Sequence, residues 1–221
     1  GSHDMCYLNG SMANLQGFYS HFLTNATEQS VLINDLPFPH TLPLNSTPYS
    51  GHTEGAGYDG PGRCMDHVFF HAPTPSPPRQ WPVEFNWSNV YVFDQMPFID
   101  DYNAGFQSTG ILYIPRACKP NSTDTPQGGC RLVIYFQACG CGGVANDIIQ
   151  GFGPWAEANA IVILSPCTNK GPNNTTRTYP GSNEIARGCL DSYGQLGRDY
   201  ATTNGVHMHV FRNILGALAG F

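Results

Sequence analysis

The chain has 221 residues and a formal net charge of −6, and only 12% of its residues are charged. Lysine and arginine together number 10 and form no basic stretch. Counterion release on binding a phosphate backbone would therefore be small, which argues against nucleic acid as a partner. Hydrophobic residues make up 41% of the chain, enough for a packed core, and we expect one domain over residues 1–221.

The predicted elements of the first part of the chain follow from its hydrophobic pattern. From Gly10 to about Leu23, apolar residues recur at intervals of three and four, which predicts an amphipathic helix. Residues 30–33 predict a short buried strand. Residues 36–62 are rich in Pro, Gly, Asn, Ser and Thr and predict ordered loop. A short helix is expected over 64–71, ended by the proline cluster at 73–78.

The second part of the chain has the pattern of an α/β protein. A strong strand signal, a helical stretch interrupted near Gly153-Pro154 and a second apolar strand follow one another, which predicts a parallel crossover unit. Two earlier strands would extend that sheet. The expected strands are 90–93, 110–114, 132–136 and 161–164, and the expected helices are 145–160 and 206–218.

Two features indicate a secreted, extracellular protein. Seven Asn-Xaa-Ser/Thr sequons predict N-linked glycans. The eight cysteines lack the spacing of a zinc site and predict disulfides. No apolar run reaches the roughly 18 residues of a membrane-spanning helix, so no membrane span is expected. The sequons are Asn9, Asn25, Asn45, Asn86, Asn121, Asn173 and Asn174.

One disulfide can be predicted from local sequence alone. Cys118 and Cys130 enclose an eleven-residue polar loop between two predicted strands. A hairpin of this kind brings its two ends close enough for a disulfide.

Several short motifs, in their shared order, resemble the secreted polyhydroxybutyrate depolymerases of the circularly permuted α/β-hydrolase type. The resemblance covers most of the chain. It implies an α/β-hydrolase-like sheet flanked by helices, stapled by disulfides and incomplete at its N-terminal, nucleophile side. The motifs are Gly1-Ser2-His3-Asp4, Pro39-His40-Thr41-Leu42-Pro43, the glycine-rich segment 57–62, Phe93-Asp94-Gln95, the strand 108–115 with Cys118, the strand 132–139 and the segment 188–194.

The resemblance implies a role for three residues of an esterase site. Asp4 would accept the Nδ1 proton of His40, and His40 would take the proton of a serine and return it to the leaving alcohol. The backbone N–H of Cys139 would donate to the oxyanion. Without the resemblance, Asp4 reads as a strand-end residue, His40 as a loop histidine like His52, and Cys139 as half of a disulfide.

The resemblance also implies the pair Cys139–Cys189. The four remaining cysteines allow three pairings, among which we expect Cys141–Cys167 and Cys6–Cys64.

Three departures from the family's pattern bear on activity. No serine among these residues has the Gly-Xaa-Ser-Xaa-Gly setting of a nucleophile elbow. Gln137-Ala138 stand where the family has His-Gly, and a Cβ at position 138 restricts the backbone of the oxyanion loop. Leu190 and Ser192 replace two tryptophans, which removes flat apolar surface from a polymer-binding cleft.

Two hypotheses follow. The chain is a catalytically inactive secreted glycoprotein derived from a serine esterase, a structural or fibre-forming component that self-assembles; or it is the larger part of an active carboxylic-ester hydrolase whose serine lies on an upstream segment. In both, a central sheet position is open and is filled by that segment or by a neighbouring copy. No cofactor or metal is expected. His207 and His209 are two residues apart in a predicted helix and so lie on different faces, and the pair His67/His71 has no third ligand and no Glu after its first His.

Overall fold

The structure is a computed structural model that describes residues 11–31, 33, 36, 42–44, 57–70, 79–101, 104–141, 151–169, 185–192 and 194–219. The chain divides into two compact units, Gly1–Pro77 and Pro78–Phe221, and each is described by itself. The single domain expected over residues 1–221 therefore stays a prediction. No helix in the described part of the chain is long and apolar enough to cross a membrane.

The first unit contains short helices. The predicted N-terminal helix is confirmed as α1, Ser11–Phe22, and it is followed by α2, Ala26–Gln29. The helix predicted near 64–71 is confirmed as α3, Gly60–Met65, which continues into the π-helical turn η1, Asp66–Phe70. Asp59 begins α3, because its carboxylate accepts the N–H of Gly62 at 2.9 Å.

The strand predicted at residues 30–33 is wrong for the residues that the structure describes. Ser30, Val31 and Ile33 lie in no strand, and Val31 is 62% exposed. A short apolar run becomes a strand only when another strand pairs with it, and the periodicity of the run does not supply that partner.

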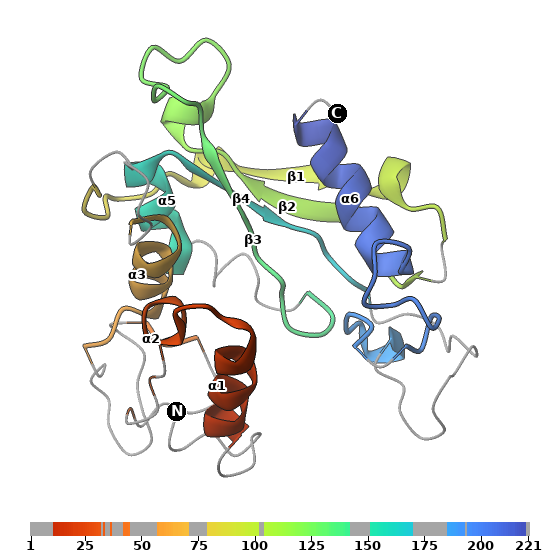
Figure 1. Cartoon of the computed structure of the whole chain (residues 1–221). Helices are drawn as coiled ribbons and strands as arrows, with labels where there is room; N and C mark the ends of the chain where they lie inside the picture. Colours follow the sequence, from red (N-terminus) through yellow and green to blue (C-terminus); the bar gives the residue numbers. More distant parts are fainter. Residues whose placement is uncertain are drawn as a thin grey trace, which may run out of the picture. The chain divides into compact units, whose positions relative to one another are not determined.

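The second unit is built on a mixed four-stranded sheet in the order β1-β2-β4-β3 (Figure 1). β1 pairs with β2 and β2 with β4 in antiparallel fashion, whereas β3 and β4 are parallel. The predicted strands and the parallel unit are thus confirmed. The bounds are Val90–Asp94 for β1, Thr109–Tyr113 for β2, Arg131–Ile134 for β3 and Ile161–Ser165 for β4.

Two helices cover the two faces of this sheet. α5, Gly153–Asn159, lies in the connection between β3 and β4. α6, Val206–Ala219, places Val210 and Ile214 in a core with Leu164 of β4. Of the helix predicted at 145–160 only the second half is described, and Gly153-Pro154, predicted as its interruption, forms the first turn of α5 because proline fits that position. Single 3₁₀ turns are η2 (Trp87–Asn89), η3 (Met96–Phe98), η5 (Arg116–Cys118) and η7 (Ile185–Arg187).

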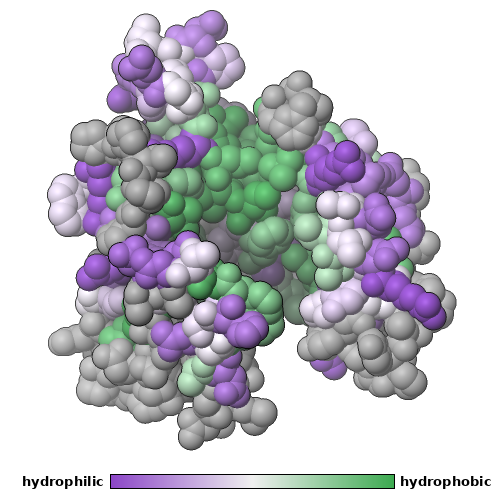
Figure 2. Space-filling view, in the orientation of Figure 1, coloured by the Kyte–Doolittle hydropathy of each residue, from purple (hydrophilic) through white to green (hydrophobic). Residues whose placement is uncertain are grey.

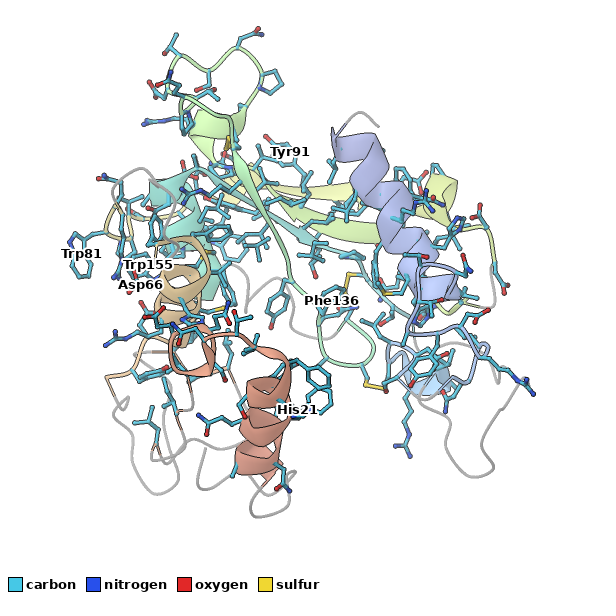
Figure 3. All side chains as sticks on the ribbon, in the orientation of Figure 1. His21, Asp66, Trp81, Tyr91, Phe136 and Trp155 are labelled. Atoms are coloured by element: carbon cyan, nitrogen blue, oxygen red, sulfur yellow. A yellow bond between two sulfur atoms is a disulfide. The ribbon has the colours of Figure 1, made fainter. Side chains whose placement is uncertain are left out.

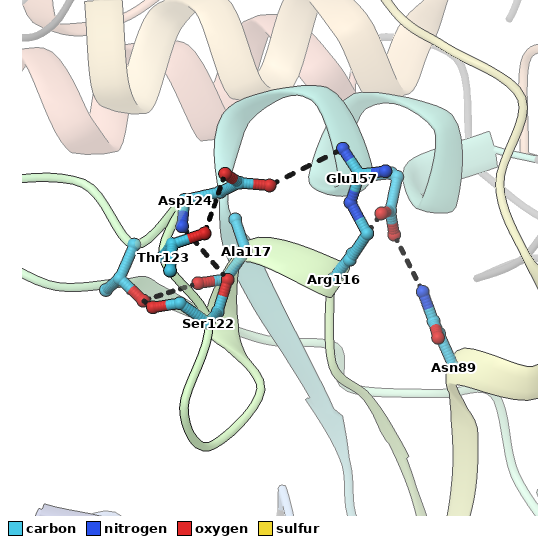
Figure 4. A network of polar contacts seen from close by, with 8 residues as sticks. Asn89, Arg116, Ala117, Ser122, Thr123, Asp124 and Glu157 are labelled. Atoms are coloured by element: carbon cyan, nitrogen blue, oxygen red, sulfur yellow. Dashed lines mark hydrogen bonds and ion pairs between the residues drawn. The ribbon is translucent and has the colours of Figure 1, made fainter.

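Glu157 of α5 connects this helix to the start of β1 and to the end of β2 (Figure 4). Its carboxylate accepts the Nδ2–H of Asn89 at 3.0 Å, the backbone N–H of Arg116 at 3.1 Å and the hydroxyl of Tyr113. Burial, together with the hydrogen bond and charge of Glu157, raises the pKa of Tyr113 well above its ordinary value. Tyr113 thus stays a neutral donor that holds α5 against β2.

His207, near the start of α6, is 4% exposed and makes two hydrogen bonds. Its Nδ1 accepts the N–H of Asp191 at 2.8 Å, so Nε2 carries the proton and donates to the carbonyl of Ala104 at 2.7 Å. Only the neutral ring can make both bonds, and burial lowers the pKa of His207 below its ordinary value. His209 lies on another side of the helix, where it is exposed and contacts Asp100 at 2.8 Å.

The expected hairpin disulfide Cys118–Cys130 is confirmed, with its Cα atoms 5.9 Å apart. Among the described residues, Cys64 forms no disulfide. Its expected partner, Cys6, lies outside the described residues, so the Cys6–Cys64 pairing stays a prediction.

A glycine in β2 allows a close cross-strand contact. A Cβ on Gly110 would lie 2.5 Å from Cε1 of Phe93 and 2.6 Å from Oε1 of the fully buried Gln95. We expect Gly110→Ala to destabilise the second unit by about 1–3 kcal/mol, because the core would be overpacked. Urea unfolding followed by tryptophan fluorescence measures this unit, since Trp81, Trp87 and Trp155 all lie in it. Gly17→Ala in α1, where nothing lies within 4 Å, should leave that midpoint unchanged; equal midpoints for all three proteins would contradict the expectation.

The buried His207 makes stability depend on pH. Because its pKa is lowered in the folded state, the unfolded chain takes up the proton first as the pH falls below the ordinary value near 6.5. Stability should be complete above that pH and decline below it, by at most about 1.4 kcal/mol per pH unit for one proton. Denaturation at pH 5–7.5 should show this slope, His207→Gln should flatten it and the exposed His209→Gln should keep it. A slope unaffected by His207→Gln would show that another group titrates.

Candidate functional site

Two disulfides fix the carboxyl ends of the parallel strands β3 and β4. Cys139 and Cys141 follow β3; Cys139 is bonded to Cys189, and Cys141 to Cys167, which follows β4. Both expected pairs are confirmed. Ligand sites of α/β sheets lie beyond the carboxyl ends of parallel strands, so this stapled end is where a site is expected.

The residue between the two cysteines contacts a second glycine. The N–H of Gly140 donates to the carbonyl of Gly188 at 2.7 Å. Gly188 has a φ of +79°, and a Cβ on it would lie 2.7 Å from the Cα of Gly140. Only glycine at position 188 combines this backbone conformation with this approach.

The side-chain amides of three glutamines form hydrogen bonds with the segment that follows β4. Gln95 donates from Nε2 to the carbonyl of Cys167 at 3.0 Å and accepts the N–H of Cys167 at 2.8 Å. Gln107 donates to the carbonyl of Thr168, and Gln137 donates to the Thr168 hydroxyl at 3.1 Å. The same hydroxyl donates to the carbonyl of Gly188. The loops around the stapled end are therefore held by hydrogen bonds as well as by sulfur.

Cys139, the residue predicted to donate to the oxyanion, lies in the segment that follows β3. It is exposed, and within the described residues its backbone N–H has no hydrogen-bond partner, whereas the next N–H, that of Gly140, is used. An unused, fixed backbone donor is what stabilisation of an oxyanion requires.

The structure shows how Gln137 and Ala138 fit at the positions where the family has His-Gly. Gln137 uses its side-chain amide to hold Thr168. Ala138 does not have a positive φ, unlike Cys141 with a φ of 55°. Because Ala138 is outside the left-handed region, its Cβ does not strain the loop in this conformation. The expected restriction of the loop's backbone freedom stays a prediction.

Apolar side chains border the Cys139 segment. Phe136, which directly precedes it, is 54% exposed and packs edge-on against Phe211 of α6, with ring centroids 5.1 Å apart (Figure 3). Figure 2 shows an apolar area at the centre of the same face, over the sheet. An apolar wall beside a polar donor suits a ligand with an ester group and an apolar chain.

Some predicted site residues lie outside the described residues, namely Asp4, His40, Cys6 and the sequons Asn9, Asn45, Asn173 and Asn174. The loop that contains His40 can be followed again at Pro43, whose carbonyl accepts the N–H of Gly60 at 2.9 Å. The remaining sequons, Asn25, Asn86 and Asn121, are on exposed positions. His71 also lies outside the described residues, and Nε2 of His67 is 3.2 Å from the carbonyl oxygen of Gln29.

Sequence reasoning missed the organising role of Asp191. Its carboxylate accepts three backbone N–H groups, from Gly194 at 2.8 Å, Gln195 at 2.9 Å and Leu196 at 2.8 Å. The order Asp191-Ser192-Tyr193-Gly194 is typical of an Asx turn and could have indicated this loop. The segment that replaces the family's tryptophans is thus a tight polar turn beside Cys189.

The chain is similar to known proteins in sequence and in fold. No family model matches the chain. The chain is 25% identical over 224 residues to a poly(3-hydroxybutyrate) depolymerase of Delftia acidovorans, an alignment that includes 94% of this chain and 39% of the relative. It thus spans well under half the length of this curated relative.

Two solved structures have a similar fold. The crystal structure of PHB depolymerase from Penicillium funiculosum matches all of this chain and 69% of its own, with a TM-score of 0.71 and 21% identity. An alanine variant of a PHB depolymerase in complex with an R3HB trimer matches 84% of this chain and 58% of its own, with a TM-score of 0.57 and 22% identity. The chain therefore resembles the poly(3-hydroxybutyrate) depolymerases over nearly all of its length and has their fold, a mixed α/β-hydrolase-like sheet flanked by helices and stapled by disulfides.

Proposed function

We propose that this chain supplies the acid, base and oxyanion groups of a secreted carboxylic-ester hydrolase, and that the nucleophilic serine is carried by a further strand that adds to β3. The chain alone then has no activity. The observation that carries the proposal is the backbone N–H of Cys139, which has no hydrogen-bond partner within the described residues and is held at the carboxyl end of the parallel strand β3.

The hydrogen-bond pattern of β3 supports the added strand. In its parallel pairing with β4, the N–H of Arg131 donates to Ala160 and that of Tyr135 to Leu164. The backbone groups of the alternate residues, Leu132 and Ile134, therefore point away from β4. Within the described residues no strand pairs with this edge.

The side chains of β3 support the same conclusion. Every residue of this strand is only partly buried, although parallel strands are normally covered on both faces. Leu132 and Ile134 pack against the core beneath α6, and the apolar area of Figure 2 lies over this region of the sheet. A strand added here would bury the rest of these side chains and satisfy the open backbone groups.

The proposed chemistry is acyl transfer to water. The serine on the added strand attacks the ester carbonyl while His40, oriented by Asp4, accepts its proton. The N–H of Cys139 donates to the oxyanion, and His40 returns the proton to the leaving alcohol. Water then cleaves the acyl-serine ester by the same groups. Phe136 is placed to contact the apolar part of such an ester.

A second candidate is a catalytically inactive, self-assembling glycoprotein in which a neighbouring copy fills the β3 edge. Gln137-Ala138 in place of His-Gly favours it, because Nε2 of Gln137 donates to the hydroxyl of Thr168. The two candidates differ in whether a reactive serine is present beside His40.

Labelling with a fluorophosphonate probe tests for that serine. The complete native protein should be labelled on one serine outside these 221 residues, and His40→Ala should reduce labelling at least 100-fold, because the proton acceptor is lost. His52→Ala, a histidine in the same predicted loop, should be labelled like the native protein. Absence of labelling in the folded native protein, found by mass spectrometry of its peptides, would favour the inactive glycoprotein.

Hydrogen exchange tests the added strand separately. In the complete native protein the amides of Leu132 and Ile134 should exchange as slowly as that of Val133, because a strand covers them. The amide of Val92, at the other edge of the sheet, serves as the internal comparison and should exchange fast. Fast exchange at Leu132 beside slow exchange at Val133 would mean that the β3 edge is open.

A further inference from the structure

We propose that Asn86 carries an N-linked glycan and that this glycan covers the open edge of β1. The inference does not depend on catalysis. It rests on the geometry of one sequon and on the strand that begins directly after it.

The sequon Asn86-Trp87-Ser88 has a fixed and accessible conformation. Oδ1 of Asn86 accepts the backbone N–H of Ser88 at 2.9 Å, and Asn86 is exposed, with φ −108° and ψ 120°. Within the described part of the chain, the Nδ2 atom that would bear the sugar makes no hydrogen bond. The local turn uses the oxygen of the amide and leaves its nitrogen available.

The turn at Asn86 is hydrogen-bonded to a buried residue. The carbonyl of Asn86 accepts the N–H of Asn89 at 2.9 Å, and Asn89 is 2% exposed and donates to Glu157. A glycan on Asn86 would therefore be held at a defined position relative to β1 and not at the end of a loose loop.

Within the described residues, no strand pairs with the outer edge of β1, and the exposed side chains beside this edge are mostly apolar. Asn89 accepts the N–H of Ile114, and the N–H of Gln95 donates to Ser108, so the odd-numbered residues face β2. The backbone groups of Val92 and Asp94 point outward, whereas the N–H of Val90 already donates to the carbonyl of Trp87. The Val92 side chain is 71% exposed, and Tyr91 is 38% exposed (Figure 3).

An edge of this kind pairs readily with another chain unless it is protected. β1, of sequence Val-Tyr-Val-Phe-Asp, has no lysine, arginine or proline, which are the usual protecting residues. Asp94, its one charged residue, already accepts the N–H of Met96 at 3.0 Å. Val92 is six residues from Asn86, at most about 20 Å along the chain, within reach of a branched oligosaccharide, which is bulky and solubilising.

The sequence offers a substitution that removes the glycan without disturbing the turn. Ser88→Ala destroys the sequon, but the backbone N–H of residue 88 remains to bond Asn86. Ser88→Thr keeps the sequon. Thr123→Ala removes the sequon of Asn121, which lies on the Cys118–Cys130 hairpin, and is the control for loss of a glycan from another segment.

The experiment secretes the full chain from a eukaryotic host and measures glycan occupancy by mass spectrometry and molar mass by light scattering after size exclusion. We expect Asn86 to be occupied in the natural sequence and in Ser88→Thr. Ser88→Ala should at least double the mean molar mass through edge pairing, Thr123→Ala should not, and Ser88→Ala with Val92→Lys should restore the monomer mass.

Any of five outcomes would overturn the proposal. An unmodified Asn86 in the natural sequence removes the glycan. Unchanged molar mass of Ser88→Ala, with loss of the glycan verified, removes its covering role. If Val92→Lys does not reverse the association, or if Thr123→Ala associates to the same extent, the β1 edge is not the surface involved. If β1 pairs with a second copy while the glycan is present, the glycan does not cover this edge.

Discussion

The parallel pairing of β3 with β4 is the constraint on which the rest of the second unit depends. α5 lies in the connection between the two strands, and two disulfides close their carboxyl ends. The disulfides span 50 and 26 residues, and in the chain-entropy model crosslinks of that size each disfavour the unfolded state by about 3.5–4 kcal/mol. Without β3 beside β4, Cys139 and Cys141 would not reach their partners, and the backbone N–H of Cys139 would have no fixed position.

Much of this arrangement could be predicted from the sequence, because it depends on local signals. The apolar runs over β1, β2, β3 and β4 have the length and turn boundaries of strands, and the Cys118–Cys130 hairpin follows from two strands and a polar loop. The strand expected at residues 30–33 had the same local signal. It did not form over its described residues, because strand formation requires a partner that periodicity does not reveal.

The candidate site was predictable only in part, for a related reason. Cys139 and its disulfide could be expected from the order of motifs. The polar groups that hold it could not, since Gln95 meets Cys167 and Gln137 meets Thr168 across long stretches of sequence. Glutamine has no preferred local structure that would indicate burial. Gln95 is nevertheless fully buried, because both the nitrogen and the oxygen of its side-chain amide form hydrogen bonds with backbone groups. Such networks appear only after the fold brings the strand ends together.

The alternation of Cys139, Gly140 and Cys141 has a consequence for how the chain matures. The thiols of Cys139 and Cys141, which are separated by a single residue, compete for the same two partners, Cys167 and Cys189. Random oxidation would therefore produce Cys139–Cys167 and Cys141–Cys189 as readily as the native pairs. The native choice requires that Gly140 already rests on Gly188, which in turn requires the sheet. Oxidation before the sheet has formed would lock the wrong loops together, so correct maturation of this protein calls for a compartment that exchanges disulfides as well as forming them.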